Sequence, residues 1–183
     1  LEPQVEAIIE MWQPGVAGGT PLAGILSGRV NPSGKLSVTF PLSTGQIPIY
    51  YNMRQSARPF DAMGDYQDIP TEPLYPFGYG LSYTTFTYSD AKLSSLKIKK
   101  NQKITAEVTV KVEGKETVLW YVSDPFCSIS RPMKELKFFE KQSLKVGESR
   151  VFRFEIDPMR DLSYTDATGK RFLEAGEFIV SVG

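Results

Sequence analysis

Residues 73–86 read PLYPFGYGLSYTTF, and this stretch decides how the chain is organised. It places two prolines, two glycines and five aromatic residues in fourteen positions. Prolines and glycines fix the backbone into turns, while aromatic rings bury large apolar areas. A solvated linker would not carry so much apolar surface, so we expect a packed junction between two bodies.

Downstream of this junction, the sequence alternates between short apolar and polar runs. Such alternation is typical of half-buried strands. Seven strands are predicted, separated by turns such as 113–115 and 145–148: 86–93, 104–112, 117–123, 136–144, 149–156, 162–165 and 177–182. This spacing favours an antiparallel β-sandwich of the immunoglobulin or fibronectin III type over residues 80–183. The Cys…Trp…Cys spacing of antibody domains is absent, because Cys127 is the only cysteine, so the fibronectin-like version is preferred.

Upstream of the junction, the sequence pattern of residues 1–41 predicts an α/β segment. The apolar spacing in residues 3–12 predicts a short helix. Thr20 and Pro21 are good first residues for a second helix, which we expect to end near Gly28. A turn at 31–34 and a strand at 36–40 are predicted to follow.

One strand with two helices cannot bury a core of useful size by itself. Residues 1–41 therefore either join strands supplied by another part of a larger protein or pack onto the downstream residues of this chain. Large exposed apolar patches usually mark interfaces. This segment is accordingly a candidate surface for association with a partner chain or for oligomerisation.

Residues 42–79 are expected to form a connecting loop that leads into the junction. A loop this long is often functional, although a connector strapped over a surface by its tyrosines explains the same residues. Aromatic rings stack on sugar faces, and Asn or Arg side chains bond hydroxyl groups. The candidate ligand-binding residues in this loop are Tyr50, Tyr51, Asn52 and Arg58.

Composition narrows the classes of function. The 21 basic and 21 acidic residues cancel, which argues against binding nucleic acid or an anionic membrane. The chain contains no histidine, so triads and metal sites that need one are excluded, and we predict no metal and no cofactor. Cys127, without a histidine partner, is expected to be structural or incidental. No secretion signal is recognisable at the start, which leaves the compartment open.

Several motifs resemble, in order along the chain, those of family 3 glycoside hydrolases, the β-glucosidases and β-xylosidases. The junction resembles the family signature PLYPFGYGLSYT. The other matching stretches are WQPG followed by GG at 12–19, GRVNPSGKL followed by TFP at 28–41, IPIYYN at 47–52, RPMKELKFF at 131–139, and EAGEF at 174–178. The resemblance runs from one end of the chain to the other.

The resemblance implies a parent enzyme with a (β/α)₈ barrel, an α/β sandwich and a fibronectin III-like domain. It implies retaining hydrolysis of β-glycosides by an aspartate nucleophile and a glutamate acid/base, which must lie close together. Both residues would precede Leu1, and Glu2, Glu6 and Glu10 do not match the acid/base motif. The implied fold is mainly β, with the end of the family's second domain at 1–41 before the sandwich.

By this resemblance, the chain is a non-catalytic C-terminal region that braces the catalytic domains, borders the sugar cleft and is inactive alone. Its partners would be the upstream catalytic domains and, through the parent, a β-glycoside or oligosaccharide. The parent would be periplasmic or secreted.

Two other functions stay open, one favoured by departures from the family pattern and the other by the unpaired apolar face of residues 1–41. The chain passes through 113–116 without the usual NTG turn, and we expect these residues to form a tight hairpin. Trp120 also replaces a smaller residue. A stand-alone carbohydrate-binding or protein-interaction module would need an exposed platform built from Trp120, Phe126, Phe138 or Phe139. A subunit of a split enzyme would instead dock through residues 1–41.

Overall fold

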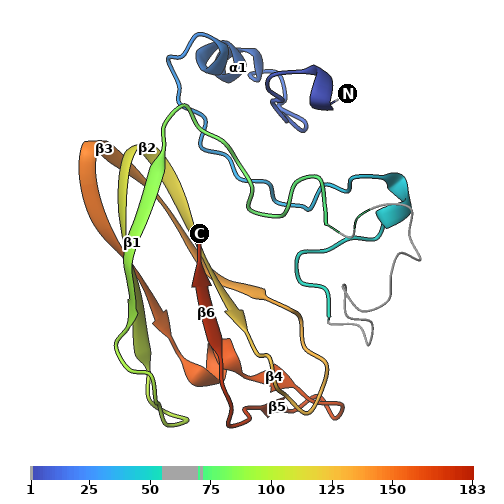
Figure 1. Ribbon diagram of the computed structural model, residues 1–183, viewed down its shortest axis with the longest axis vertical. Helices are drawn as coiled ribbons and strands as arrows, with labels where there is room; N and C mark the ends of the chain where they lie inside the picture. The colour runs from blue at the N-terminus through green and yellow to red at the C-terminus, as the bar shows by residue number, and fades with distance from the viewer. Residues whose placement is uncertain (1, 55–69, 71) are drawn as a thin grey trace.

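The computed structural model describes residues 2–54, 70 and 72–183. Figure 1 shows an N-terminal part at one end of the molecule, followed by an elongated β-structure that contains the C-terminus. The N-terminal part contains two short 3₁₀ helices, η1 (Glu2–Gln4) and η2 (Thr44–Gln46), and one α-helix, α1 (Gly19–Leu26). The fold is mainly β, as the sequence predicts.

The β-structure is dominated by two long antiparallel strands, β2 (Ile104–Ser123) and β3 (Glu135–Ile156). Strand β1 (Phe86–Leu93) pairs with the first half of β2, and β6 (Ile179–Val182) pairs with its second half. A small ribbon of β4 (Tyr164–Thr165) and β5 (Arg171–Phe172) follows a one-turn helix, η3 (Pro158–Leu162). All of these strand pairs are antiparallel.

The predicted turns at 113–115 and 145–148 are wrong, and so is the tight hairpin at 113–116. Four predicted strands are fused into β2 and β3, which run side by side through both positions. Between the pairs Val112–Glu148 and Gly114–Leu144, β2 advances two residues and β3 advances four. Gly114 has φ 142° and Gly147 has φ 75°, conformations that favour glycine. The turn-like residues therefore bend two paired strands through a bulge instead of reversing one strand.

This bend places the two halves of β2 and β3 opposite each other as the two layers of a sandwich (Figure 1). Trp120 from one half and Phe154 from the other lie with ring centroids 6.2 Å apart. Alternate residues of both halves point inward and form a single core: Val108, Val110, Val118, Trp120, Val122, Phe152, Phe154 and Ile156. The period-two pattern of the sequence thus defines the inner face of each layer.

The N-terminal part departs most from the sequence prediction. No helix forms over residues 5–12, and only η1 covers residues 2–4. Val5, Ile8 and Ile9, which would make the buried face of that helix, are exposed. A helix this short needs packing on its apolar face, and the described part of the chain offers none there.

Two smaller expectations in this part are also modified. Helix α1 forms where predicted, but Gly18 precedes it and Thr20 lies inside it, so Thr20 is not the cap. The predicted strand at 36–40 is reduced to one isolated bridge between Phe40 and Tyr75. Near the C-terminus, the predicted strand at 162–165 is shortened to β4, because η3 extends to Leu162.

Candidate functional site

The junction stretch lies antiparallel beside residues 36–40. The amide of Leu36 donates to the carbonyl of Tyr79, and the amide of Gly78 donates back to the carbonyl of Leu36, both at 2.8 Å. Phe40 and Tyr75 exchange two further backbone hydrogen bonds. The rings of Tyr75 and Tyr79 stack at 5.0 Å between centroids. The aromatic stretch is therefore a packed joint, as its composition predicts.

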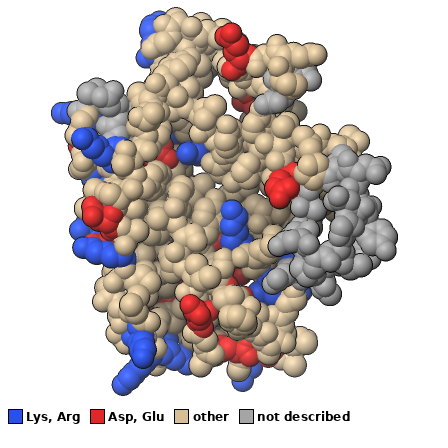
Figure 2. All heavy atoms as spheres, viewed as in Figure 1, with Lys and Arg blue, Asp and Glu red and all other residues tan. Residues whose placement is uncertain are grey.

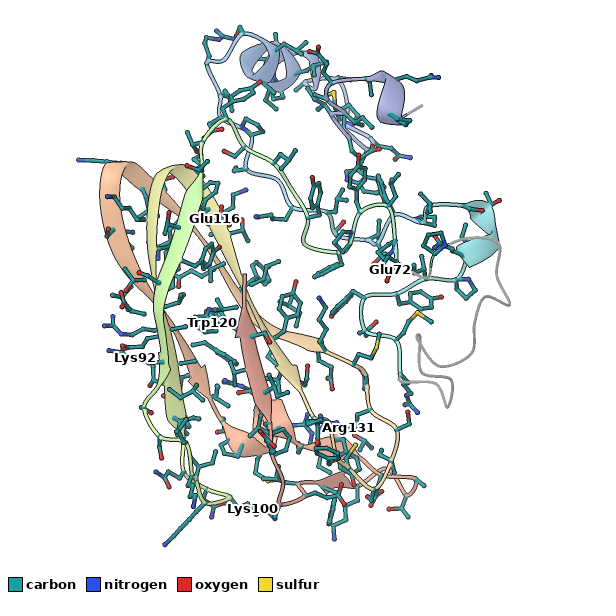
Figure 3. The ribbon with its side chains drawn as sticks, viewed as in Figure 1. Glu72, Lys92, Lys100, Glu116, Trp120 and Arg131 are labelled. Carbon is teal, nitrogen blue, oxygen red and sulfur yellow. The ribbon has the colours of Figure 1, made fainter. Side chains whose placement is uncertain are left out.

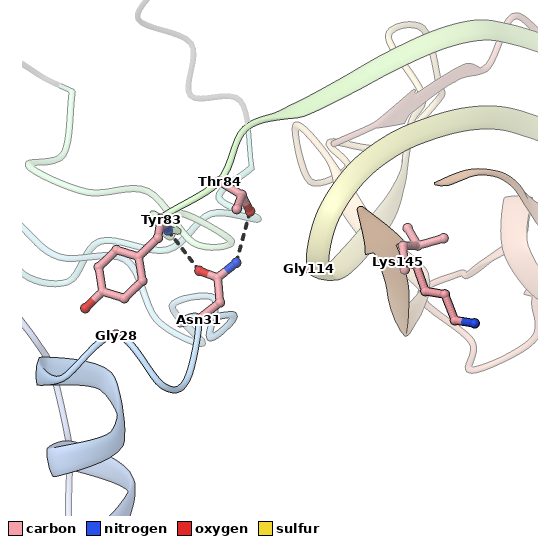
Figure 4. Close-up of a pocket in the computed structure, with 7 residues that line it drawn as sticks. Gly28, Asn31, Tyr83, Thr84, Gly114 and Lys145 are labelled. Atoms are coloured by element: carbon pink, nitrogen blue, oxygen red, sulfur yellow. Dashed lines mark hydrogen bonds between the residues drawn. The ribbon is translucent and has the colours of Figure 1, made fainter. Parts of the chain in front are cut away.

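Asn31 ties the N-terminal part to the entry of β1 (Figure 4). Its side-chain oxygen accepts hydrogen bonds from the hydroxyl of Ser82 at 2.8 Å and from the amide of Tyr83 at 2.9 Å. Its side-chain nitrogen donates to the hydroxyl of Thr84 at 3.0 Å. The hydroxyl of Tyr83 in turn donates to the carbonyl of Ile25 at 2.8 Å. One asparagine thus fixes the position of three consecutive residues of the joint.

Two glycines allow this close approach. A β-carbon on Gly114 would lie 2.6 Å from the side-chain nitrogen of Asn31. A β-carbon on Gly80 would collide with the carbonyl oxygen of Gly34, a backbone atom that cannot move freely. Gly114 therefore serves both the close approach of Asn31 and the backbone conformation of the bend, while Gly80 serves the close approach of the Gly34 backbone.

A buried carboxylate also crosses the joint. Glu116 in β2 is almost fully buried, and its Oε1 lies 3.1 Å from the ammonium of Lys35 in the N-terminal part. The hydroxyl of Tyr88 donates to the same oxygen at 3.0 Å. Burial, together with this neighbouring carboxylate, raises the pKa of Tyr88 well above its usual value. Figure 3 places Glu116 at the end of the sandwich that faces the N-terminal part.

A strap formed by residues 50–54 lies across the sandwich near the start of β3. The amide of Met133 donates to the carbonyl of Met53 at 2.8 Å, and Arg54 forms an isolated bridge with Pro132. The amide of Leu136 also points at the hydroxyl of Tyr51, at 3.4 Å. The loop is thus attached to the sandwich by its backbone.

Tyr51 fills an aromatic slot between the junction and the sandwich. Its ring stacks on Phe77 with centroids 4.1 Å apart and an interplanar angle of 19°, and meets the edge of Tyr121 at 6.2 Å. The ammonium of Lys134 lies 4.9 Å from the centre of the Tyr121 ring. Burial, and to a smaller extent the nearby Tyr51, raises the pKa of Tyr121 to about 12.

The four predicted ligand-binding residues therefore fall into three environments. Tyr51 is half-buried and packed, whereas Tyr50 is 61% exposed and Asn52 is also exposed. Arg58 lies outside the described residues. Their role in ligand binding stays a prediction.

Sequence reasoning did not single out the charged residues that the fold buries. Arg131 is 4% exposed and donates to Asp124 at 2.7 Å, to the carbonyl of Leu162 at 2.9 Å and to Glu135 at 3.3 Å. Figure 3 places it at the end of the sandwich away from the joint. Arg131 and Glu135 both belong to the RPMKEL motif, but the motif gave no sign of the other two partners, Asp124 and Leu162.

The buried carboxylates are already committed to cations. Glu116 pairs with Lys35, Asp124 with Arg131, and Asp161 with Arg160. Among residues 2–54, 70 and 72–183, no cluster of three His, Cys, Asp or Glu side chains could hold a metal ion. These buried carboxylates are placed to hold the fold together.

In the same described part of the chain, no helix has the length and apolar character needed to span a membrane.

The described residues line hollows at both ends of the sandwich. One, of about 550 Å³, opens at the joint and is lined by Asn31, Tyr83, Thr84, Gly114 and Lys145 among others (Figure 4). The other, of about 740 Å³, lies at the opposite end of the sandwich and is lined mainly by apolar residues that include Leu93, Ile98, Leu173 and Phe178. The first coincides with the contact between the two bodies and is broadly open to solvent.

Two family descriptions match the chain. Residues 1–83 match the glycosyl hydrolase family 3 C-terminal domain, and residues 116–183 match the fibronectin type III-like domain. The chain is 44% identical to the periplasmic beta-glucosidase of Salmonella typhimurium, over 98% of this chain and 25% of that protein. It is 42% identical to a putative beta-xylosidase of Formosa agariphila, over 100% of this chain and 24% of that protein.

Solved structures agree with these sequence relatives. The beta-glucosidase of Listeria innocua in complex with glucose superposes with a TM-score of 0.88 at 41% identity, over 95% of this chain and 25% of that chain. A mutant of the same enzyme in complex with laminaribiose superposes with a TM-score of 0.85 at 43% identity, again over 95% and 25%. The chain therefore spans about a quarter of the length of these proteins.

Proposed function

Because the chain belongs to glycoside hydrolase family 3, of which it carries the C-terminal domain and the fibronectin type III-like domain, we propose that it braces the catalytic domains of a β-glucosidase-like enzyme. In this proposal the chain itself is non-catalytic and borders the sugar cleft through its strap. The retaining carboxylate pair belongs to the part of such an enzyme that precedes this chain.

The observation that carries the proposal is the joint itself. Lys35 reaches the buried Glu116, and Asn31 holds three residues at the entry of β1. The ammonium of Lys141 in β3 adds a hydrogen bond to the carbonyl of Ser33 at 2.8 Å. Contacts of this number and burial support a rigid connection, which is what a brace between domains requires.

The apolar surface of the N-terminal part supports the same proposal. Eight large apolar side chains of residues 2–41 are exposed: Val5, Ile8, Ile9, Trp12, Val16, Leu26, Val30 and Val38. In Figure 2, charged side chains are sparse over this part, at the top of the view, and denser along the sandwich below it. The preceding domains of the parent enzyme are the proposed occupant of this surface.

Hydrolysis of p-nitrophenyl β-glucoside and β-xyloside tests the proposal. The 183-residue chain is assayed alone and after fusion to the upstream region of the Salmonella typhimurium relative, cut where the alignment with this chain begins. We expect no activity from the chain alone, little from the upstream region alone, and clear activity from the fusion. Activity of the isolated chain, or a fusion no better than the upstream region, would contradict the proposal.

A stand-alone carbohydrate-binding module is the second candidate. Of its four possible platform rings, Trp120 lies in the core and Phe138 stacks on Phe154 at 5.4 Å. Phe126 and Phe139 are well exposed but lie on different elements, the segment after β2 and strand β3. Glycan-array binding by residues 80–183 alone would favour this candidate over the brace.

A subunit of a split or oligomeric enzyme is the third candidate, favoured by the same apolar surface on residues 2–41. It differs from the brace only in whether the occupant of that surface belongs to the same polypeptide. Sedimentation of the purified chain tests this candidate. A monomer would count against it. Self-association that is lost on fusion to the upstream region would show that the same surface contacts a second chain and the upstream region.

A further inference from the structure

The strap contains a turn whose central residues point in different directions. The amide of Met53 donates to the carbonyl of Tyr50 at 3.3 Å, which closes a four-residue turn with Tyr51 and Asn52 at its middle. The Tyr51 ring packs inward, whereas Tyr50 and Asn52 are exposed. The sequence groups Tyr50, Tyr51 and Asn52 as ligand contacts. The structure separates a packed residue, Tyr51, from two exposed residues, Tyr50 and Asn52.

The inward ring contacts both bodies at once. Phe77, on which Tyr51 stacks, belongs to the junction, and Tyr121, which it meets edge-on, belongs to β2. Phe77 and Tyr121 also contact each other, with centroids 6.5 Å apart and an interplanar angle of 81°. Three mutually packed rings define one position for the Tyr51 backbone more tightly than any pair would.

The backbone on the far side of the turn is fixed by the sandwich. Met53 accepts a hydrogen bond from the amide of Met133, and Arg54 bridges to Pro132. Residues 132 and 133 precede β3, which begins at Glu135 and is anchored in the core. The turn is therefore held at its middle by an aromatic slot and at its end by a backbone bridge.

We propose that Tyr51 is a positioning residue through which the fibronectin-like domain sets the conformation of a sugar-binding turn. In this inference, the exposed ring of Tyr50 stacks on the apolar face of a pyranose, and the Asn52 amide bonds its hydroxyl groups. The ligand class is the outer sugar of a β-linked disaccharide. The sugar-binding part rests on the proposed function, while the positioning part concerns the chain alone.

The rigid support of this turn matters for binding, because a ligand-binding side chain must be held close to its productive position. An exposed tyrosine and an exposed asparagine on an unsupported turn would lose conformational freedom on binding, which weakens affinity. The aromatic slot removes that freedom in advance. A sandwich domain remote from the reacting atoms would thereby act on the binding of substrate.

The positioning part is tested on the 183-residue chain by hydrogen exchange at the Met133 amide. Tyr51→Ala empties the slot, and we expect exchange at Met133 to accelerate at least tenfold. Tyr51→Phe keeps the stacked ring and should stay within threefold of the original chain. Phe138→Leu is the matched control, because it removes a partly exposed ring whose stacking partner is Phe154 of the sandwich and not a ring of the aromatic slot. Unchanged exchange in Tyr51→Ala, or equal acceleration in Tyr51→Phe, would overturn the inference.

The sugar-binding part is tested in the active fusion with laminaribiose and with p-nitrophenyl β-glucoside. Tyr51→Ala, Tyr50→Ala and Asn52→Ala should each raise KM for laminaribiose about fivefold or more, with kcat within about twofold, since contacts to an outer sugar form equally before and during reaction. Phe138→Leu should leave KM unchanged.

The two tests fail separately. An inactive fusion would contradict the proposed function, and the exchange measurement would still decide whether Tyr51 positions the turn. Faster exchange without any change in KM would overturn the sugar-binding part. Raised KM in Tyr51→Ala but not in Tyr50→Ala or Asn52→Ala would show that the two exposed residues are not the ligand contacts and would likewise overturn it.

Discussion

The ammonium of Lys35 lies 3.1 Å from the Oε1 atom of Glu116, although 81 residues separate them in the sequence. The Glu116 side chain is 3% exposed, whereas that of Lys35 is 22% exposed. A carboxylate this deeply buried is stable in its charged form only when it is paired and hydrogen-bonded. The N-terminal part therefore supplies the charge that allows the sandwich to bury Glu116.

Removal of Lys35 should destabilise the whole chain, because it leaves a buried charge without its cation. We expect Lys35→Met to lower the free energy of unfolding by about 2–4 kcal/mol, measured by urea denaturation. The double variant Lys35→Met with Glu116→Gln should recover part of this loss, since no buried charge remains. Lys103→Met, which breaks an exposed pair with Glu155, is the control and should leave the urea midpoint nearly unchanged. Equal effects of Lys35→Met and Lys103→Met would contradict the prediction.

Substitution of the joint glycines should loosen the contact between the two bodies. Gly114→Ala introduces a β-carbon 2.6 Å from the Asn31 side chain at a φ of 142°, and Gly80→Ala introduces one against the backbone of Gly34. We expect each to lower the free energy of unfolding by about 2 kcal/mol or more. Gly176→Ala is the control, because its nearest new contact is 3.7 Å away. A thermal melt in which all three variants match the original chain would rule this out.

Trp120 offers a test of core packing. It is 2% exposed, and its indole nitrogen has no hydrogen-bond partner among the described residues. Trp120→Phe loses some volume but also removes that unpaired donor, so we expect a loss of no more than about 1.5 kcal/mol. Trp120→Ala should lower the free energy of unfolding by about 3–5 kcal/mol. Denaturant titration measures both, and a larger loss for Phe than for Ala would refute this account.

The raised pKa of Tyr121 predicts a loss of stability at high pH. The unfolded chain releases the Tyr121 proton near pH 10, whereas the folded chain retains it until about pH 12. The stabilising contribution is complete below pH 10 and is lost as the pH rises toward 12. Tyr88 contributes in the same direction, since its pKa is also raised.

Absorbance at 295 nm measures this titration directly. Tyr121→Phe should remove one late-titrating phenol and make the free energy of unfolding fall less steeply between pH 10 and 12. A titration in concentrated guanidinium is the control, since all tyrosines are solvated there and should titrate near pH 10. If Tyr121→Phe left the late part of the folded-state curve unchanged, Tyr121 would not be a late-titrating phenol and the prediction would be wrong.

The sequence predicted β1 with the same bounds that the structure has, because its alternation and flanking turns are local signals. The same signals failed at Gly114 and Gly147. Glycine and charged residues occur both where a strand reverses and where paired strands bend, and pairing decides between the two. The proposed boundaries at residues 41/42 and 79/80 remain predictions.

The candidate site shows the same division. The motifs pointed to Asn31, the junction and the strap, but gave no way to see that Tyr51 faces inward while Tyr50 and Asn52 face solvent. Side-chain direction in an irregular loop depends on partners elsewhere in the chain. Phe77 and Tyr121 decided it here, and no periodicity connects them to Tyr51.

By itself, the sequence determined the family, the mainly β class and the position of the joint, because these depend on motifs and on alternation within a few residues. The tertiary structure alone decided that residues 5–12 form no helix, that four strand patterns make two bent strands, and that Glu116 pairs with Lys35. Each of these depends on whether a distant segment is present to bury an apolar face or neutralise a charge. That is a property of the packed chain, and local patterns do not contain it.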